Sequence, residues 1–280
     1  PEVSVGPIAE VIQYDPALSG KILKTVNSSY YGLSSPCPTI SRAVGLLGID
    51  AIKTLVLGFS LADVTKDENI DEAGLNDFWR RAVYGAAAAR RIAERTNAVD
   101  PEEAFTAALL QDIGMLAMHS VSAVSYPTIL DSAGNNHVAL PSIEEAQLSF
   151  THAEAGAGLA TRWNLPDRLV EPIRLHHPVG SETSCDPLVD TVRLAFRVAQ
   201  LVEDDATEEQ LEDLWRTAEA LFTLTADEIN QIVRKTSEDA RELSSLLAVE
   251  VGKPSDVNKL LAQAEDARVL HSLAIQKRSE

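Results

Sequence analysis

The chain has 280 residues and a formal net charge of −18, from 24 lysines and arginines against 42 aspartates and glutamates. This balance argues against a nucleic-acid-binding protein, because neutralising phosphates requires a basic face. The two cysteines, Cys37 and Cys185, cannot form a disulfide framework, and the apolar stretches are far shorter than the roughly 20 residues that span a bilayer. We therefore expect a soluble, cytoplasmic protein without membrane insertion.

The first 66 residues predict a small helical lobe. Asp15 followed by proline is typical of a helix start, and the apolar residues behind it fall on one stripe. A turn over residues 27–32 ends this helix. Ser41 is expected to cap a short helix that ends at Gly48, and Asp50 to open the next one.

Residues 67–202 predict a helical bundle. A polar, acidic connector is expected over residues 65–76, followed by a long helix from Asp77 whose small residues permit close packing. Asp100 begins a capping box, and the helix that it opens is expected to continue through residues 111–112.

Further helix-start signals place the histidines of this bundle. Ser142 is expected to open one helix, and a capping box at Thr151 puts His152 in the first turn of the next. A shorter helix then ends at His176 and His177. All three histidines are therefore predicted at helix ends.

Residues 203–280 predict an acidic helical extension. Capping boxes at Thr207 and Thr225 each precede an amphipathic helix, and a last, thinly apolar helix is expected from Ser255. We expect this extension to pack on the same domain, to pack on a second copy, or to lead into a further domain. Because the chain begins at Pro1 without a methionine, we also expect it to be a piece of a longer protein. With no alternating strand pattern, the predicted fold class is all-α.

Asp112 and three histidines are the candidates for chemistry. Asp112 lies among apolar residues, and a buried carboxylate needs a partner because an isolated buried charge is costly. Together with His152, His176 and His177 it resembles the ligand inventory of a phosphohydrolase that holds one or two divalent cations to activate water.

Several stretches resemble the HDOD family, a regulatory relative of the HD-type phosphohydrolases. They occur in the family's order over about residues 1–202 and comprise Asp15–Gly32, Ser41–Gly48, Leu109–Gly114, His152–Ala160, Trp163–Pro166 and Ile173–His177. The resemblance implies a small amino-terminal helical lobe packed on an HD-like helical bundle.

The departures from this pattern concern the metal ligands. The resemblance implies that Gln111 stands where metal-binding relatives have a histidine, Arg81 where they have another, and Phe196 where they have an aspartate. Asp190, on another side of the same predicted helix as Phe196, cannot take over. An amide is a weak ligand and a guanidinium repels a dication. We therefore expect neither a metal nor a cofactor, and a degenerate pocket in which Asp112 pairs with Arg81 or with other hydrogen-bond donors.

Each surviving residue also has a purely structural interpretation. Asp112 can bond to backbone N–H groups, and the three motif histidines can serve as core or cap residues. The remaining histidines match no motif and are expected at surface or hydrogen-bonded polar positions: His119, His137 and His271.

The most specific part of the first lobe is its turn. Asn27, Ser28, Tyr30 and Tyr31 are candidates for an interaction surface. The alternative is a helix-terminal turn that packs the lobe against the bundle.

The resemblance implies a non-catalytic bacterial signalling module that acts through protein–protein interaction or conformational relay. Its expected partner is a neighbouring domain or protein of GGDEF, EAL or response-regulator type, and self-association stays open. Two alternatives remain: a residual metal-dependent phosphohydrolase acting on nucleotides or cyclic dinucleotides, and a pseudo-enzyme that binds such a ligand through Arg81 without cleaving it.

Overall fold

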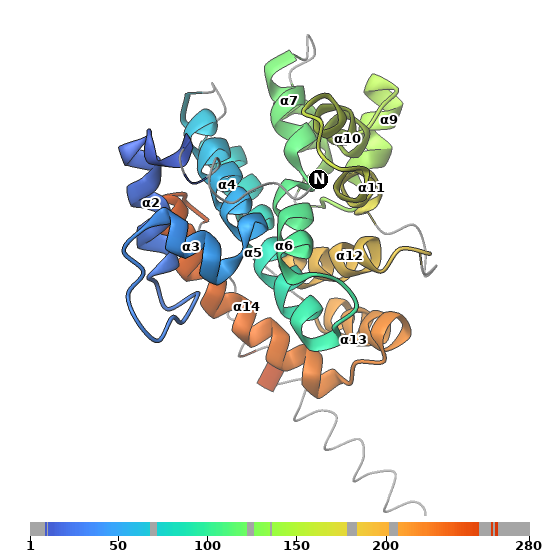
Figure 1. The fold of residues 1–280 in the computed structure, drawn as a ribbon. Helices are drawn as coiled ribbons and strands as arrows, with labels where there is room; N and C mark the ends of the chain where they lie inside the picture. Colours follow the sequence, from blue (N-terminus) through green and yellow to red (C-terminus); the bar gives the residue numbers. More distant parts are fainter. Residues whose placement is uncertain are drawn as a thin grey trace, which may run out of the picture.

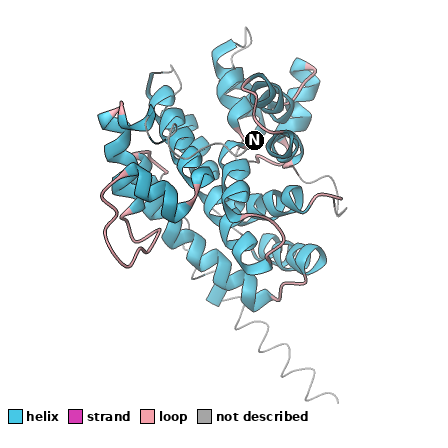
Figure 2. Ribbon diagram, viewed as in Figure 1, coloured by secondary structure: helices cyan, strands magenta, loops and turns pink. Residues whose placement is uncertain are grey.

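The computed structural model describes residues 9, 11–67, 72–121, 126–134, 136–177, 184–201, 207–251, 259 and 261–262. All regular secondary structure in this part of the chain is helical (Figure 1 and Figure 2), so the predicted all-α class is confirmed. Among these residues, no single helix is long and apolar enough to cross a membrane; α3 and α4, which together reach that length, are bent by 118°.

Three helices form the amino-terminal lobe: α2 (Pro16–Val26), α3 (Ile40–Leu47) and α4 (Ile49–Asp67). As predicted, Asp15 caps α2 by accepting the Leu18 N–H, with proline at the first helical position. The α3 helix is capped by Thr39 and not by Ser41. The lobe lies to one side of the molecule in Figure 1.

The bundle is built around three helices: α5 (Glu72–Thr96), α6 (Pro101–Leu110) and α12 (Pro187–Gln200). The connector expected over residues 65–76 was predicted too long, because α4 continues to Asp67 and α5 begins at Glu72. Fully buried alanines along α5, among them Ala82, Ala86 and Ala89, let its neighbours approach closely.

The helix is interrupted at residues 111–112, where one continuous helix was expected. After α6 ends at Leu110, Gln111 and Asp112 form a turn, and α7 (Ile113–Val121) begins as a separate helix. The break lets α7 pack on α10 (His152–Arg162), where Gly114 and Gly156 bring the two backbones together. Tertiary packing therefore overrides the uninterrupted apolar pattern.

The segment after α7 forms the side of the molecule opposite the lobe (Figure 1). It contains α10, the hairpin of α8 (Tyr126–Ala133) and α9 (Leu140–Leu148), and α11 (Asp167–Leu175). The hairpin and α7 share a small apolar cluster, separate from the main core and formed by Met115, Met118, Tyr126, Ile129 and Leu140. Helix α9 begins at Leu140, slightly before the expected Ser142, and α10 has the predicted capping box.

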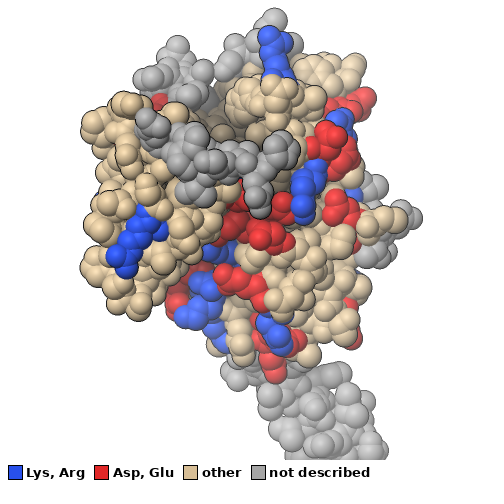
Figure 3. Space-filling view, in the orientation of Figure 1, with Lys and Arg blue, Asp and Glu red and all other residues tan. Residues whose placement is uncertain are grey.

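The described part of the acidic extension packs on the bundle. Helices α13 (Glu208–Phe222) and α14 (Ala226–Leu247) begin at the two predicted capping boxes, and their apolar faces join the main core. On α14, Asp239 accepts from Arg91 of α5 at 2.6 Å. Charged side chains of both signs intermingle over the bundle and extension in Figure 3. Most of the helix predicted from Ser255 lies outside the described residues.

The close contact between Gly114 of α7 and the backbone of α10 predicts that adding a single methyl group at Gly114 lowers stability. A Cβ at Gly114 would lie 1.9 Å from the His152 carbonyl oxygen and 2.5 Å from the Gly156 nitrogen, so Gly114→Ala should destabilise the protein by about 3 kcal/mol. A Cβ at Gly158 of α10 would meet no described atom within 4 Å, so Gly158→Ala should stabilise the protein by about 0.5–1 kcal/mol. Urea denaturation of both variants measures the difference, and equal unfolding free energies would contradict the close contact.

Candidate functional site

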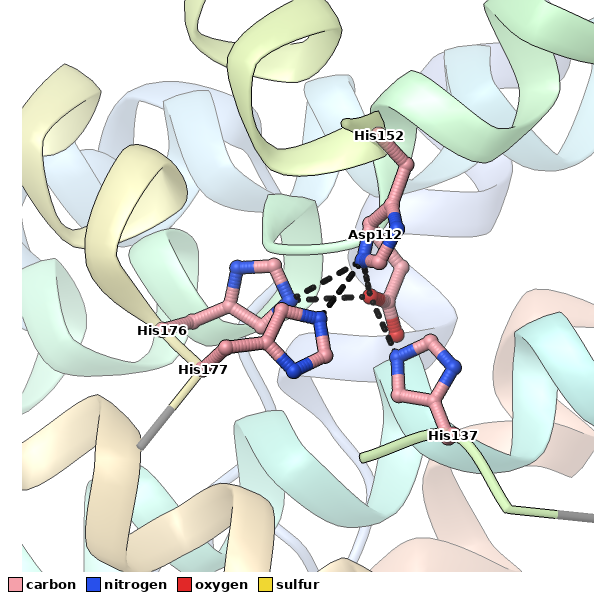
Figure 4. Close-up of side chains that lie close together, drawn as sticks. All are labelled: Asp112, His137, His152, His176 and His177. Carbon is pink, nitrogen blue, oxygen red and sulfur yellow. Dashed lines mark hydrogen bonds and ion pairs between the residues drawn. The ribbon is translucent and has the colours of Figure 1, made fainter. Parts of the chain in front are cut away.

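Asp112 lies at the centre of a buried polar cluster (Figure 4). Its side chain is fully buried in the turn between α6 and α7. Oδ2 accepts a hydrogen bond from Arg81 Nε at 3.2 Å. Oδ1 faces the Nε2 atoms of His137 at 3.1 Å, His176 at 3.2 Å and His152 at 3.5 Å. The two oxygens of one carboxylate therefore have different tasks.

The side chains around Asp112 come from separate segments and point toward one another (Figure 4). His152 is the first residue of α10, while His176 and His177 follow α11. One potential ligand atom from each of these residues, from Asp112 and from His137 lies within 4.8 Å of all the others. The four motif residues are thus brought together in space.

His137 is the residue that sequence reasoning missed. It was expected at a surface or hydrogen-bonded polar position, and the second applies: it is 6% exposed and lies in the turn before α9, against Asp112. Its place in the cluster was not predicted. The α8–α9 hairpin contacts the pocket at two points, because Glu144 of α9 also lies 2.8 Å from His152. A histidine in a turn between two helix patterns carried no sequence signal of this placement. His119 of α7 packs edge-on against Tyr126 of α8, and His271 lies outside the described residues.

Arg81 forms the ion pair that was expected in the degenerate pocket. It is 8% exposed, and besides Asp112 it contacts the Met115 sulfur at 3.4 Å through Nη2. The guanidinium approaches the side of the carboxylate that the histidines leave free, so Arg81 balances the buried charge without occupying the space between the imidazoles.

Gln111 and Phe196 take different positions at this pocket. The buried Gln111 amide lies beside Gly85 of α5 and has no hydrogen-bond partner among the described residues. The Phe196 ring forms an apolar wall, with its centroid 5.2 Å from that of His177 and 5.5 Å from that of His137. Asp190 instead accepts the Ser184 N–H at 2.9 Å.

Two histidines have their ring orientation set by a second hydrogen bond. His152 Nδ1 lies 2.8 Å from Glu144 Oε2, and this buried carboxylate also accepts the His152 backbone N–H and the Tyr126 hydroxyl. His176 Nδ1 lies 2.8 Å from the Ile173 carbonyl oxygen. Because carboxylate and carbonyl oxygens only accept, both Nδ1 atoms carry the proton and both Nε2 atoms point into the cluster.

The surroundings shift the pKa values of these groups in different directions. Burial alone would raise the pKa of Asp112, but its contacts with His137, His152 and His176 hold that pKa well below the usual range. Burial also opposes the charged form of His152, yet its bonds to Asp112 and Glu144 raise its pKa to about 9. Burial and then the Arg81 charge lower the pKa of His137 to about 3, and burial and the neighbouring imidazoles lower that of His177. At neutral pH the cluster therefore pairs an ionised Asp112 with a protonated His152, while His137 and His177 stay neutral.

The lobe turn is occupied by contacts within the chain. The Asn27 side chain bonds both the N–H and the carbonyl of Cys37 at 2.6 and 2.9 Å. Arg90 of α5 lies over the rings of Tyr30 and Tyr31, 4.9 and 5.1 Å from their centroids. Ser28 has a buried hydroxyl with no hydrogen-bond partner among the described residues. These positions agree with the packing alternative for the turn.

Arg90 links the turn to a second helix of the bundle. Its Nη2 atom lies 2.6 Å from Glu102 of α6. Glu242 of α14 also contacts the turn, where it accepts the Tyr30 N–H at 3.0 Å and the Ser29 hydroxyl at 2.8 Å. The turn therefore joins the lobe to α5, α6 and the extension at one point.

Comparison with known proteins identifies the family. The family model of the HDOD domain matches residues 1–179. The chain belongs to the HDOD family. A curated relative from Treponema pallidum (strain Nichols), named "Uncharacterized protein", is 25% identical over 213 residues, which are 75% of this chain but 41% of that protein.

Three solved structures share the HDOD fold of this chain. An HDOD domain protein from Geobacter sulfurreducens superposes with a TM-score of 0.70 at 20% identity, covering 88% of this chain and 87% of that one. A Shewanella amazonensis SB2B protein titled "Putative phosphohydrolase" gives 0.68 at 24% identity, covering 88% of each chain. A Marinobacter aquaeolei VT8 protein titled "Putative signal transduction protein" gives 0.64 at 20% identity, covering 89% of this chain and 56% of that one.

The donor set of this HDOD pocket fits a metal ion. Four imidazole nitrogens and one carboxylate oxygen suit first-row transition metals, and Glu144 behind His152 is the kind of outer carboxylate that orients a histidine ligand. Asp112, His137, His152, His176 and His177 would hold the ion. In an open site such an ion activates water, but four of these five side chains are buried.

Because the Arg81–Asp112 pair is buried, removing one partner is expected to lower the unfolding free energy substantially. Arg81→Met would leave a buried carboxylate without its cation, so we expect a loss of about 3–5 kcal/mol in unfolding free energy. Arg174, whose ion pair with Glu171 is largely exposed, provides the control, and Arg174→Met should change stability by less than about 1 kcal/mol. Chemical denaturation compares the two, and similar small losses would show that the buried pair contributes little.

Proposed function

We propose that this HDOD chain is a non-catalytic output module of bacterial signal transduction, acting in the cytoplasm. The observation that carries the proposal is the enclosed state of the pocket. Asp112, His152 and His176 are fully buried, and Arg81 holds the carboxylate oxygen that faces away from the histidines.

Catalysis by an HD-type site needs features that these residues do not favour. A catalytic metal keeps a coordination position open for water or substrate, and a two-metal site needs further acidic ligands. Here Phe196 presents an aromatic ring where the family resemblance implies an aspartate. The Shewanella protein's title names a phosphohydrolase, but at 24% identity the likeness supports a shared fold and no shared activity.

Binding of a nucleotide by Arg81 is also disfavoured. A guanidinium that recognises phosphate must present its N–H groups to the ligand. Arg81 is 8% exposed, and its Nε already donates to Asp112.

The packing of α5 and α6 supports a conformational relay. Helix α5 carries Arg81 at the pocket and, about 13.5 Å further along, Arg90 at the lobe turn. Helix α6 carries Glu102 near that turn and leads directly into Asp112. Two rigid helices thus join the pocket to the contact between lobe and bundle, so a rearrangement at either end can bias the other.

A neighbouring protein domain is the proposed recipient of this output. The chain spans 41% of the Treponema relative and 56% of the Marinobacter protein, so both of those proteins contain substantial additional sequence. A GGDEF, EAL or response-regulator type of domain fits this role, as does a second copy of the chain.

The non-catalytic assignment predicts no metal-dependent hydrolysis. Purified protein incubated with Mn²⁺ or Fe²⁺ and either bis(p-nitrophenyl) phosphate or cyclic di-GMP should release product no faster than the Asp112→Asn variant. Release of nitrophenol or of linear dinucleotide measures the rate. Metal-dependent turnover that Asp112→Asn abolishes would establish an enzyme instead.

The relay predicts that a change at Asp112 reaches the lobe turn. In Asp112→Asn, amide hydrogen exchange over residues 27–33 should accelerate about fivefold relative to exchange in α13, which corresponds to about 1 kcal/mol of local opening free energy. Asp190→Asn is the matched control, since it removes a buried carboxylate outside the cluster. Equal exchange at the turn in the two variants would contradict the relay.

A further inference from the structure

Helix α14 touches both the amino-terminal lobe and the bundle. It packs on α2 and α4 of the lobe and on α5 of the bundle, and in Figure 1 it runs from behind the lobe to α13. The match to the HDOD family model ends at residue 179, whereas α14 begins at Ala226. The contacts of α14 are therefore a property of this chain that lies outside the matched HDOD region.

The carboxylate of Glu242 holds α14 on the lobe turn. Its Oε1 atom accepts the Tyr30 N–H at 3.0 Å, and the Ser29 hydroxyl lies 2.8 Å from each of the two carboxylate oxygens. Hydrogen bonds to an ionised acceptor are stronger than those between neutral groups. The rings of Tyr30 and Tyr31 lie against Arg90 of α5. The turn is thus held by the bundle through its rings and by α14 through its polar groups.

Two further contacts tie the carboxyl-terminal end of α14 to the helices of the relay. A Cβ on Gly58 of α4 would lie 3.4 Å from Leu247 Cδ2 and 3.5 Å from Leu109 Cδ2, so α4, α14 and α6 meet at this glycine. Beyond the helix, the Val251 carbonyl accepts from Arg80 Nε of α5 at 2.8 Å. Arg80 is the neighbour in sequence of the arginine that binds the pocket carboxylate. The end of α14 is therefore attached to both helices that lead to the pocket.

The attachment of α14 differs along its length. Ile229, Val233 and Ala240 are fully buried in the main core. Glu242, in contrast, is half-buried, and its partner Ser29 is exposed. Hydrogen bonds at a partly exposed site contribute modestly to stability, so this contact can break while the earlier part of the helix stays in the core.

We propose that α14 is a latch, with Glu242 as the residue that fastens the lobe turn and keeps the lobe docked on the bundle. Release of Glu242 frees the lobe and the end of α14 together. This latch rests on the proposed relay and gives it an exit: a rearrangement at the pocket reaches the lobe turn through α5 and α6, and Glu242 passes it to α14.

Amide hydrogen exchange in the full chain tests the latch. In Glu242→Ala, exchange should accelerate about tenfold over α2, the lobe turn, α3 and residues 240–247, because these segments are released together. Exchange in α12 should stay unchanged. Glu238→Ala is the matched control, since Glu238 lies on the same helix and its partner Lys235, at 2.7 Å, also belongs to α14. This control should leave exchange in the lobe unchanged.

A second variant tests the same contact from the lobe. Ser29→Ala removes an exposed hydroxyl and so keeps the test decisive if Glu242→Ala does not fold. It should accelerate exchange in the same segments by a smaller factor, about threefold. Unchanged exchange in Ser29→Ala would count against the latch.

The double variant Asp112→Asn/Glu242→Ala tests whether pocket and latch are coupled. Asp112→Asn alone should accelerate exchange over residues 240–247, and it should add little once Glu242→Ala has already released them. A side chain with a merely structural role would give additive effects.

Two outcomes would overturn the inference. One is acceleration in Glu242→Ala that is confined to residues 29–31, because Glu242 would then only cap the turn. The other is additive behaviour of the double variant. If Asp112→Asn leaves the turn unchanged while Glu242→Ala still releases the lobe and the end of α14, the relay fails and the fastening role of Glu242 stands.

Discussion

The arrangement of this protein depends on how one buried carboxylate is satisfied. Asp112 is fully enclosed, and an uncompensated charge there would cost several kcal/mol. The structure divides the task between the two oxygens, with Arg81 on Oδ2 and histidines on Oδ1. This solution requires α5, α10, α11 and the α8–α9 hairpin to meet at one point, and the close contact of Gly114 with α10 sets how near they come.

The same helices that enclose the pocket also reach the amino-terminal lobe. Arg90 of α5 lies against both tyrosines of the lobe turn and pairs with Glu102 of α6. Acidic residues of α14 bind the turn and α5, so part of the chain's excess negative charge is used inside the fold. The lobe, pocket and extension are thus physically connected, which suits a module whose output is a change in conformation.

Helix starts were the most predictable features of the fold. Asp15, Asp100, Thr151, Thr207 and Thr225 all cap helices as expected, because a cap depends on hydrogen bonds within a few residues of chain. Other boundaries depend on packing between distant segments. The break at residues 111–112 and the start of α5 at Glu72 could not be inferred from local patterns, since apolar periodicity continues across the first and polar composition obscures the second.

The sequence by itself determined the all-α class, the HDOD family and four members of the buried cluster: Asp112, His152, His176 and His177. It also indicated the Arg81–Asp112 pair, because both residues fall on motif positions. Only the tertiary structure decided that His137 joins them, that Gln111 lies beside α5, and that Asp112 offers its two oxygens to different partners. The physical reason is that motif spacing reports position along helices, whereas the meeting of donor atoms depends on how separate helices cross.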